Sequence, residues 1–144
     1  MVTNAKILQV DDGENNVFFM RRALDKAGLA HSLFHVHDGQ EAVEYLTGKD
    51  PYNDRAKFPL PDLLLLDLRM PRMNGFDVLA WLRAQPELNK LPVVVFSSSN
   101  RKEDIQQALS LGASDFQTKP LDPQSFVQIL QALDQRWLNS TNAQ

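Results

Sequence analysis

Short apolar segments alternate with amphipathic helical patterns along the chain. Strand-like runs occupy residues 7–10, 33–36, 63–66 and 93–96, and a short fifth strand fits around 114–118. Each run is followed by apolar residues at helical spacing, as with Val17, Met20 and Leu24 after the first run. The leucines at 63–66, with no polar alternation, predict a strand that is covered on both faces.

Capping residues mark the ends of the predicted helices. A glycine after the last apolar position ends three of them, at Gly28, Gly48 and Gly112. Asn100 with Glu103 predicts the start of the fourth helix, and Asp122 before Pro123 predicts the start of the last one. The segment 49–61, which contains three prolines, predicts a long surface loop.

Strands that alternate with helices predict an α/β fold. The expected architecture is a flavodoxin-like, doubly wound, five-stranded parallel sheet of order 2-1-3-4-5 with five helices. We expect residues 1–144 to form a single domain with a core at about 4–138, a polar tail at 139–144 and no output domain. Ligands bind such sheets at the carboxyl ends of the strands, where the strand order reverses.

Composition narrows the classes of function. The chain has 144 residues, a net charge of −3 and no cysteine, so disulfides and thiolate metal sites are excluded. Its interspersed charges argue against a nucleic-acid or anionic-membrane surface. No apolar stretch approaches the roughly 20 residues that span a bilayer, and no signal peptide is evident. We expect a cytoplasmic protein.

Polar residues follow four of the predicted strands. Asp11 and Asp12 follow the first, Asp67 the third, Ser97 the fourth and Lys119 the fifth. Singly, the aspartates could cap helices or turns, the serine could bond to the backbone, and the lysine could be a solvated surface residue. Their convergence on one sheet edge favours a common site.

Three carboxylates in one cleft repel each other and need cations. Lys119 supplies one charge, and a set of oxygen ligands without cysteine points to Mg²⁺. A metal beside a carboxylate, a hydroxyl and an ammonium can accept a phosphoryl group, with Asp67 as the nucleophile.

Four motifs resemble the response-regulator receiver domains of two-component signalling. They are ILQVDD at 7–12, LLDLRMPRMNG at 65–75, VVFS at 94–97 and FQTKP at 116–120. The resemblance covers about residues 4–138. In its loop at 49–61 and in the expected lack of an output domain, the chain resembles the small regulators paired with bacterial and cyanobacterial phytochromes.

The resemblance implies a role for each matching position. Asp67 would be the phosphoacceptor, and Mg²⁺ would be bound by Asp67, Asp12, Asp11 through water, and the backbone carbonyl of Arg69. Lys119 would pair with the phosphoryl group. The matched switch and turn positions are Ser97, which would move onto a phosphoryl oxygen, Phe116, which would turn inward, and Pro120, which would follow a cis peptide bond.

Two positions depart from the commonest family pattern. Ser97 stands where threonine is more frequent, and it lacks the methyl group that limits the rotamers of threonine. Phe116 stands where tyrosine is also common, and it lacks the hydroxyl group. Arg69 and Ser99 occupy positions that tune autodephosphorylation in this family.

The family implies a signalling switch rather than an enzyme, with Mg²⁺-dependent self-phosphorylation and slow autodephosphorylation. Its partners would be a histidine kinase, such as one of phytochrome type, or a phosphotransfer protein. A second copy of the chain could bind through the face formed by the fourth helix, fifth strand and fifth helix. We expect no nucleic-acid or membrane partner.

Three alternatives use a similar fold or similar chemistry. A haloacid-dehalogenase-like phosphatase needs an acid at position 69, where this chain has arginine. A flavodoxin-like electron carrier needs a phosphate loop after the first strand, where the aspartates would repel a flavin phosphate. A non-phosphorylated pseudo-receiver, acting only as a binding module, is the strongest alternative.

Overall fold

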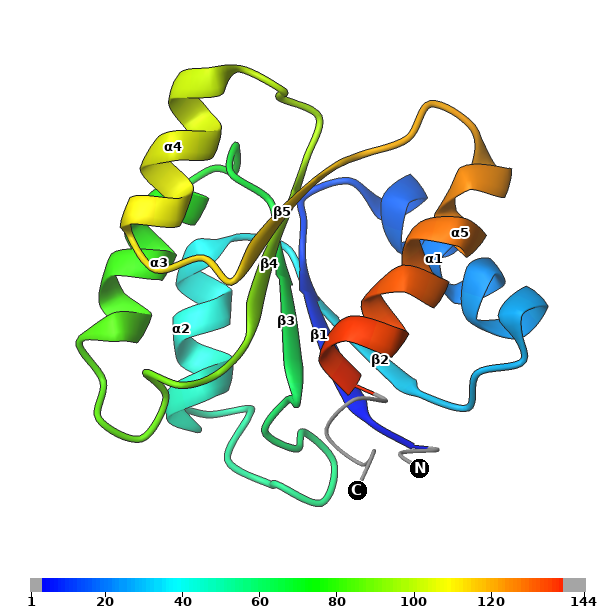
Figure 1. The fold of residues 1–144 in the computed structure, drawn as a ribbon. Helices are drawn as coiled ribbons and strands as arrows, with labels where there is room; N and C mark the ends of the chain where they lie inside the picture. The colour runs from blue at the N-terminus through cyan, green and yellow to red at the C-terminus, as the bar shows by residue number, and fades with distance from the viewer. Residues whose placement is uncertain (1–3, 139–144) are drawn as a thin grey trace.

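The computed structural model describes residues 4–138, which form a five-stranded parallel sheet (Figure 1). The spatial order is β2-β1-β3-β4-β5, as the sequence predicts. The strands are β1 (Lys6–Val10), β2 (Ser32–Val36), β3 (Leu63–Leu66), β4 (Val93–Ser97) and β5 (Asp115–Thr118). The order reverses between β1 and β3, so these two strands lie side by side at the switch point.

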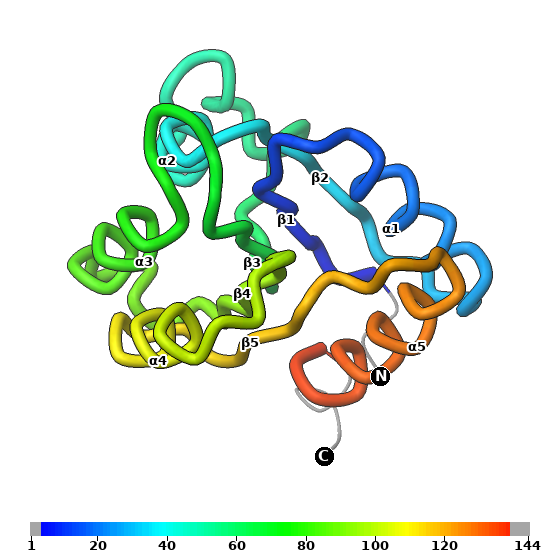
Figure 2. The backbone as a smooth tube through the Cα atoms, turned by 90° about the horizontal axis from the view of Figure 1, so that it is seen from above, coloured from blue at the N-terminus to red at the C-terminus, as the bar shows by residue number. Residues whose placement is uncertain are grey.

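Helices cover both faces of the sheet. On one face, α1 (Glu14–Ala27) packs against α5 (Pro123–Leu133), which continues into the π-helical turn η1 (Asp134–Leu138). The other face carries α2 (Gly39–Thr47), α3 (Gly75–Arg83) and α4 (Lys102–Ser110) (Figures 1 and 2). Within residues 4–138, no helix has the length and apolar character needed to cross a bilayer.

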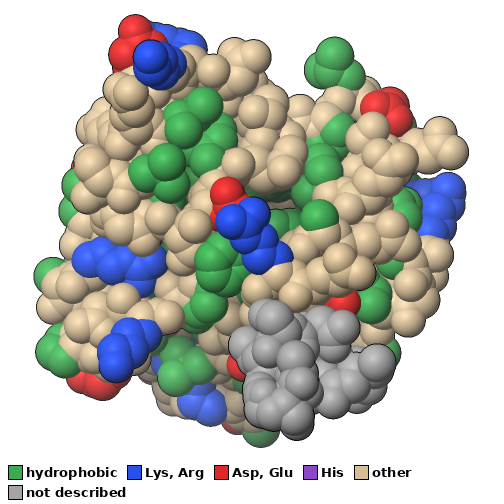
Figure 3. Space-filling model, viewed as in Figure 1, with side chains coloured by type: hydrophobic (Ala, Val, Ile, Leu, Met, Phe, Trp, Pro, Cys, Tyr) green, Lys and Arg blue, Asp and Glu red, His purple; other side chains and the backbone are tan. Residues whose placement is uncertain are grey.

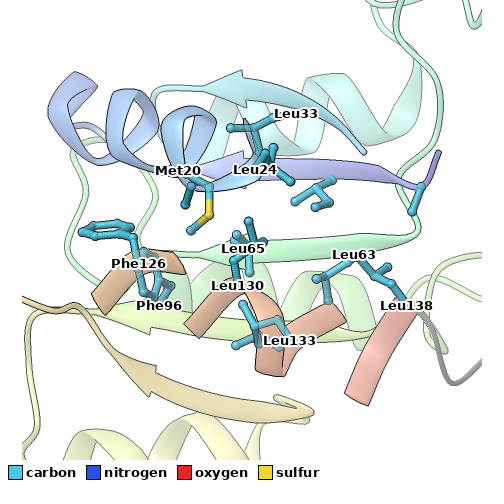
Figure 4. Close-up of a cluster of buried hydrophobic side chains, with 14 of the residues drawn as sticks. Met20, Leu24, Leu33, Leu63, Leu65, Phe96, Phe126, Leu130, Leu133 and Leu138 are labelled. Atoms are coloured by element: carbon cyan, nitrogen blue, oxygen red, sulfur yellow. The ribbon is translucent and has the colours of Figure 1, made fainter. Parts of the chain in front are cut away.

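The four leucines of β3 separate two hydrophobic cores. Leu63 and Leu65 point into the core beneath α1 and α5, where Met20 and Leu130 meet them (Figure 4). Leu64 and Leu66 belong to the opposite core, beneath α2, α3 and α4. All four are at most 1% exposed, which confirms the prediction of a strand covered on both faces.

Most of the predicted helix ends are confirmed. Gly28 and Gly48 adopt the left-handed conformation as C-caps, and the Asp122 side chain accepts a hydrogen bond from the Ser125 N–H at the start of α5. The predicted start of the fourth helix is wrong. The N-cap of α4 is Arg101 rather than Asn100, and its side chain makes no capping hydrogen bond.

The loop at 49–61 is held firmly against α2. The Arg55 guanidinium donates to the carbonyls of Tyr45 and Leu46, at 2.8 and 3.0 Å, and so adds hydrogen bonds to carbonyls in the last turn of the helix. The rings of Tyr52 and Phe58 pack at an angle against the ring of Tyr45, with centroids 5.1 and 6.0 Å from it. The loop is therefore an aromatic extension of the core at the end of the molecule where the strands begin (Figure 1).

Candidate functional site

The predicted site residues meet at the carboxyl ends of four strands. Seen from above, the loops that follow β1, β3, β4 and β5 surround this edge (Figure 2). Backbone hydrogen bonds continue the sheet into the site, because the Asp67 N–H donates to the Val10 carbonyl and the Lys119 N–H donates to the Ser97 carbonyl. The sheet therefore fixes the backbone positions of Asp67 and Lys119.

The carboxylates of Asp11, Asp12 and Asp67 lie close together. Each offers an oxygen within 4.8 Å of the others. The Lys119 ammonium lies 2.8 Å from Asp11 Oδ2 and 3.0 Å from Asp67 Oδ2, and its side chain is 10% exposed. This lysine is the one cation paired with these carboxylates among residues 4–138. The predicted convergence of charges is confirmed.

Three residues that the sequence analysis did not single out contact Asp11. The Asn16 amide donates to both carboxylate oxygens of Asp11, at 3.2 and 3.3 Å, and the Gly13 N–H donates to Oδ1 at 2.8 Å. His35 Nε2 lies 2.7 Å from the Asp11 carbonyl oxygen. Asn16 lies in the first turn of α1, so its placement after a double aspartate is the sequence signal that was available.

Burial and charge perturb the two central ionisable groups. Burial raises the pKa of the Asp67 carboxyl above its usual value; Lys119 offsets part of the rise, and the charge of Asp11 adds to it. Burial by itself would lower the pKa of the Lys119 ammonium, but hydrogen bonds and charges from Asp11 and Asp67 raise it overall. The lysine therefore stays charged, and one further cation would relieve the carboxylates.

The raised pKa of Asp67 predicts that the stability of the fold depends on pH. The folded chain holds the Asp67 proton more tightly than the unfolded chain, so the metal-free protein should lose stability as the pH rises above about 3.8 through the pKa of folded Asp67. Asp67→Asn removes that cost. We expect it to raise the free energy of unfolding at neutral pH by about 1 kcal/mol, because the burial of the Asp67 charge, with the repulsion from Asp11, outweighs the attraction of Lys119.

Urea denaturation in the presence of a chelator measures this difference. Adding Mg²⁺ should then stabilise the wild type more than Asp67→Asn, because a ligand stabilises the folded state that binds it. A variant that is less stable than the wild type in chelator would contradict the prediction.

The switch residues lie on β4 and β5, and one prediction about them is wrong. Ser97 is fully buried and its Oγ accepts a hydrogen bond from the Ser99 N–H at 3.2 Å, while Phe116 is half-buried against the core beneath α4. The peptide bond before Pro120 is trans, and Asp50–Pro51 is the cis bond within residues 4–138. The trans form is the more stable one at proline, and the Lys119 N–H extends the pairing with β4, so no cis bond is needed to bring Lys119 to the site. The movements of Ser97 and Phe116 stay predictions.

The loop after β3 is anchored to α2. Arg72 has a φ of 67°, in the left-handed region, and its guanidinium makes two bonds to the Asp38 carboxylate, at 2.9 and 3.1 Å. The Gly39 N–H donates to the Met73 carbonyl, and a Cβ at Gly39 would overlap that oxygen. These contacts fix the loop that carries Arg69, whose predicted carbonyl ligand to the metal stays a prediction.

Arg69 also makes a side-chain contact that the sequence did not predict. Its Nη2 donates to both oxygens of Asp104 on α4, at 3.0 and 3.2 Å, and the Ser99 hydroxyl donates to Asp104 Oδ2 at 2.6 Å. The Asp104 carboxylate therefore joins the loop after β3 to the loop after β4.

The model of the response regulator receiver domain matches residues 7–131. The chain belongs to this family. The structure of the phosphorylated cyanobacterial phytochrome response regulator RcpA is similar to this receiver, with a TM-score of 0.86 and 32% identity over 95% of this chain and 96% of that one. The response regulator Rcp1 of Synechocystis is 28% identical over 93% of this chain and 89% of its own length.

The predicted family is thereby confirmed, and its similarity to a phytochrome response regulator agrees with the sequence analysis. The Mn²⁺-bound form of Rcp1 is also similar in structure, with a TM-score of 0.82 and 28% identity over 93% of this chain and 94% of that one. In this receiver, the cluster of Asp11, Asp12 and Asp67 supplies carboxylate oxygens that could bind a divalent metal ion.

Proposed function

We propose that this receiver accepts a phosphoryl group on Asp67 from a histidine kinase or a phosphotransfer protein, with Mg²⁺ as the metal. The observation that carries the proposal is the shared lysine: Lys119 bonds Asp11 and Asp67 at once, and none of the three side chains is more than 10% exposed. A cation held beside a buried carboxylate nucleophile stabilises the charge that develops on a transferring phosphoryl group.

The chemistry needs little beyond these residues. An Asp67 carboxylate oxygen attacks phosphorus, the phosphorus–nitrogen bond of the donor histidine breaks, and its electron pair returns to the imidazole ring. Lys119 holds Oδ2, so Oδ1, with a weak 3.5 Å contact from the Arg69 N–H, is the less engaged oxygen. Asp11, Asp12, Asp67 and the Arg69 carbonyl would hold Mg²⁺, which when bound neutralises charge on the phosphoryl oxygens.

The neighbouring residues favour a switch over a phosphatase. Rapid turnover by a haloacid-dehalogenase-like enzyme needs an acid at position 69, but that side chain is an arginine paired with Asp104. A stable acyl phosphate suits a signalling device, since the phosphoryl group adds about −1.5 to −2 charges that can reorganise nearby hydrogen bonds.

We propose that the signal leaves through the face formed by α4, β5 and α5, toward a partner protein or a second copy of the chain. Hydrophobic side chains gather on this face between α4 and β5 (Figure 3). Leu109 on α4 is 47% exposed, and Phe116 on β5 is half-buried. Ser97 is paired with Thr118 of β5, so a movement of Ser97 would reach this face over a short path.

Treatment with acetyl phosphate and Mg²⁺, followed by intact-mass analysis, tests the proposal. We expect a single phosphoryl gain in the wild type, and none in Asp67→Asn or in the presence of a chelator. Sedimentation of the same samples should show stronger self-association, or unchanged mass with a changed affinity for the kinase, after modification. A folded wild type that gains no phosphoryl group would make the pseudo-receiver, a binding module, the better account.

A further inference from the structure

Asn74 and Gly75 form the one Asn-Gly pair of the chain, and they join the loop after β3 to α3. The nitrogen of a glycine can attack the side chain of an asparagine before it, because glycine has no Cβ to shield that nitrogen or to restrict its backbone. The pair lies in the connection that leads from Asp67 into α3. A reaction here would therefore alter the backbone that follows the phosphoacceptor.

Both residues make hydrogen bonds that oppose this reaction. Asn74 is the N-cap of α3: its Oδ1 accepts a hydrogen bond from the Asp77 N–H at 3.0 Å, and its own N–H donates to Asp77 Oδ2 at 3.4 Å. The Gly75 N–H donates to the Leu68 carbonyl at 3.0 Å. The attacking nitrogen and the side chain under attack are therefore both engaged.

The backbone of Asn74 also lies far from the geometry of ring closure. The ring that forms needs the Gly75 nitrogen on the same side as the Asn74 side chain, but ψ of Asn74 is 176°, which is extended. Rotation toward the ring would move Gly75, and a Cβ built on Gly75 would already overlap the Asp67 carbonyl oxygen. The pair can therefore react only when this turn opens.

Contacts with α2 hold the same loop closed. Arg72 makes two hydrogen bonds to the Asp38 carboxylate, at 2.9 and 3.1 Å, and the Met73 carbonyl accepts from the Gly39 N–H at 3.0 Å. The Arg72 side chain is 56% exposed, so water screens its ion pair. Opening of the loop requires that these contacts are released, and the arginine pair is the one that a substitution can remove.

We propose that Asn74 is a self-modification site, which the folded loop protects and which is converted to aspartate and isoaspartate when the loop opens. The Gly75 nitrogen loses its proton and attacks Asn74 Cγ. A bond forms between these two atoms, the bond from Cγ to the amide nitrogen breaks, and ammonia leaves with the proton. Water then opens the succinimide ring, at the side-chain carbonyl to give aspartate or at the main-chain carbonyl to give isoaspartate.

The two products differ in their effect on the site. Aspartate keeps the N-cap of α3, because its carboxylate caps a helix as well as asparagine does. Isoaspartate adds one carbon atom to the main chain before Gly75, so Gly75 can no longer both begin α3 and bond Leu68. We expect the turn at Asp67 to be displaced and the Mg²⁺ affinity to fall at least about tenfold, an effect that rests on the proposed function.

Peptide mapping by mass spectrometry measures the rate of the modification. The whole protein is incubated at mildly alkaline pH with a chelator, and loss of the Asn74 amide is followed in folded samples and in samples unfolded by urea. We expect the folded chain to react about 25-fold more slowly, because a helix cap and a backbone hydrogen bond each contribute about fivefold protection. Arg72→Met, which loosens the folded loop, should react about threefold faster than the wild type.

Arg136→Met is the matched control. It also removes an arginine that is mostly exposed and paired with a carboxylate, in this case Asp115, and it should react at the wild-type rate. Calorimetric titration of aged wild type should show tight Mg²⁺ sites reduced by the fraction of isoaspartate in the peptide map. Asn74→Asp carries the other product from the start and should bind Mg²⁺ with the affinity of fresh wild type.

Each outcome decides a separate question. Equal rates in the folded and the unfolded chain would overturn the inference, and so would a rate for Arg72→Met that equals the wild-type rate. Aged protein that keeps all of its tight Mg²⁺ sites would refute the effect of isoaspartate on the metal site. Fresh wild type that binds no Mg²⁺ would count against the proposed function, and the rates, which are measured in chelator, would still test the modification.

Discussion

Replacing Lys119 with methionine is expected to slow phosphoryl transfer to Asp67 by at least about 100-fold, as loss of one preorganised charge donor commonly does. The ammonium lies within 3.0 Å of the carboxylates of both Asp11 and Asp67, and water reaches little of it. Methionine fills similar space without the charge, so the pocket should keep its shape. The rate of acetyl phosphate uptake, followed by intact mass, measures the effect.

The same substitution should affect phosphoryl transfer without weakening the binding of Mg²⁺. Without Lys119, Asp11 and Asp67 are left as a buried anionic pair, and the metal-free variant should lose about 3 kcal/mol of unfolding free energy. Mg²⁺ should bind the variant at least as tightly as the wild type, because it no longer competes with the ammonium. Calorimetric titration measures that affinity, and the loss of stability should largely disappear at saturating Mg²⁺.

Lys90→Met, at an exposed position, provides the control and should match the wild type in all three measurements. Uptake of the phosphoryl group at the wild-type rate by Lys119→Met would show that this lysine has no part in the transfer. A variant that no longer binds Mg²⁺ would instead indicate a collapsed pocket.

Gly75→Ala should destabilise the protein by about 3 kcal/mol, the upper end of the cost of overpacking. Gly75 is the first residue of α3 and donates its N–H to the Leu68 carbonyl at 3.0 Å. A Cβ there would overlap the Asp67 carbonyl oxygen and lie 2.8 Å from Leu68 Cα. Backbone surrounds the added methyl group, so the turn that carries Asp67 would have to move. Urea denaturation should show the loss, and Mg²⁺ affinity should fall with it.

Gly28→Ala separates crowding from backbone conformation. Gly28 has a φ of 69° and open space around its Cα, so alanine there costs only the left-handed strain of about 1 kcal/mol. Its Mg²⁺ affinity should equal that of the wild type, since Gly28 follows α1 at the end of that helix away from the carboxyl ends of the strands (Figure 1). If Gly75→Ala and Gly28→Ala had equal free energies of unfolding and equal Mg²⁺ affinities, the claim that the backbone around Gly75 leaves no room for a Cβ would be refuted.

The sheet was predictable because local signals agree with the global fold. The four leucines of β3 specify a central strand, and Gly28, Gly48 and Asp122 mark helix ends in the places where the structure has them. The start of α4 was predicted wrongly because Asn100 has a local cap pattern that the tertiary structure does not use. Ser99 and Asp104 organise that turn instead, and Asp104 is held by Arg69 from another part of the chain.

Some residues of the site were predictable from local sequence signals, and others were not. Asp11, Asp67 and Lys119 were predictable because each follows a strand, and parallel strands end at one edge. Side chains that reach the site from helices or across loops have no comparable signal, as with Asn16 and Asp104. Their roles depend on side-chain direction and distance, which hydrophobic periodicity does not encode.

The central place of β3 has a mechanical consequence for how such a receiver transmits a signal. Its leucines are packed on both faces, and β1 and β4 are bonded along both of its edges. An interior of this density is stiff, so a strain that arises at Asp67 cannot be relieved by displacing the strand. We expect the movement instead in the loops before and after α4, which lie outside the sheet. A change at the phosphoacceptor should therefore travel outward as rotation of loops and of one helix, over a sheet that stays still.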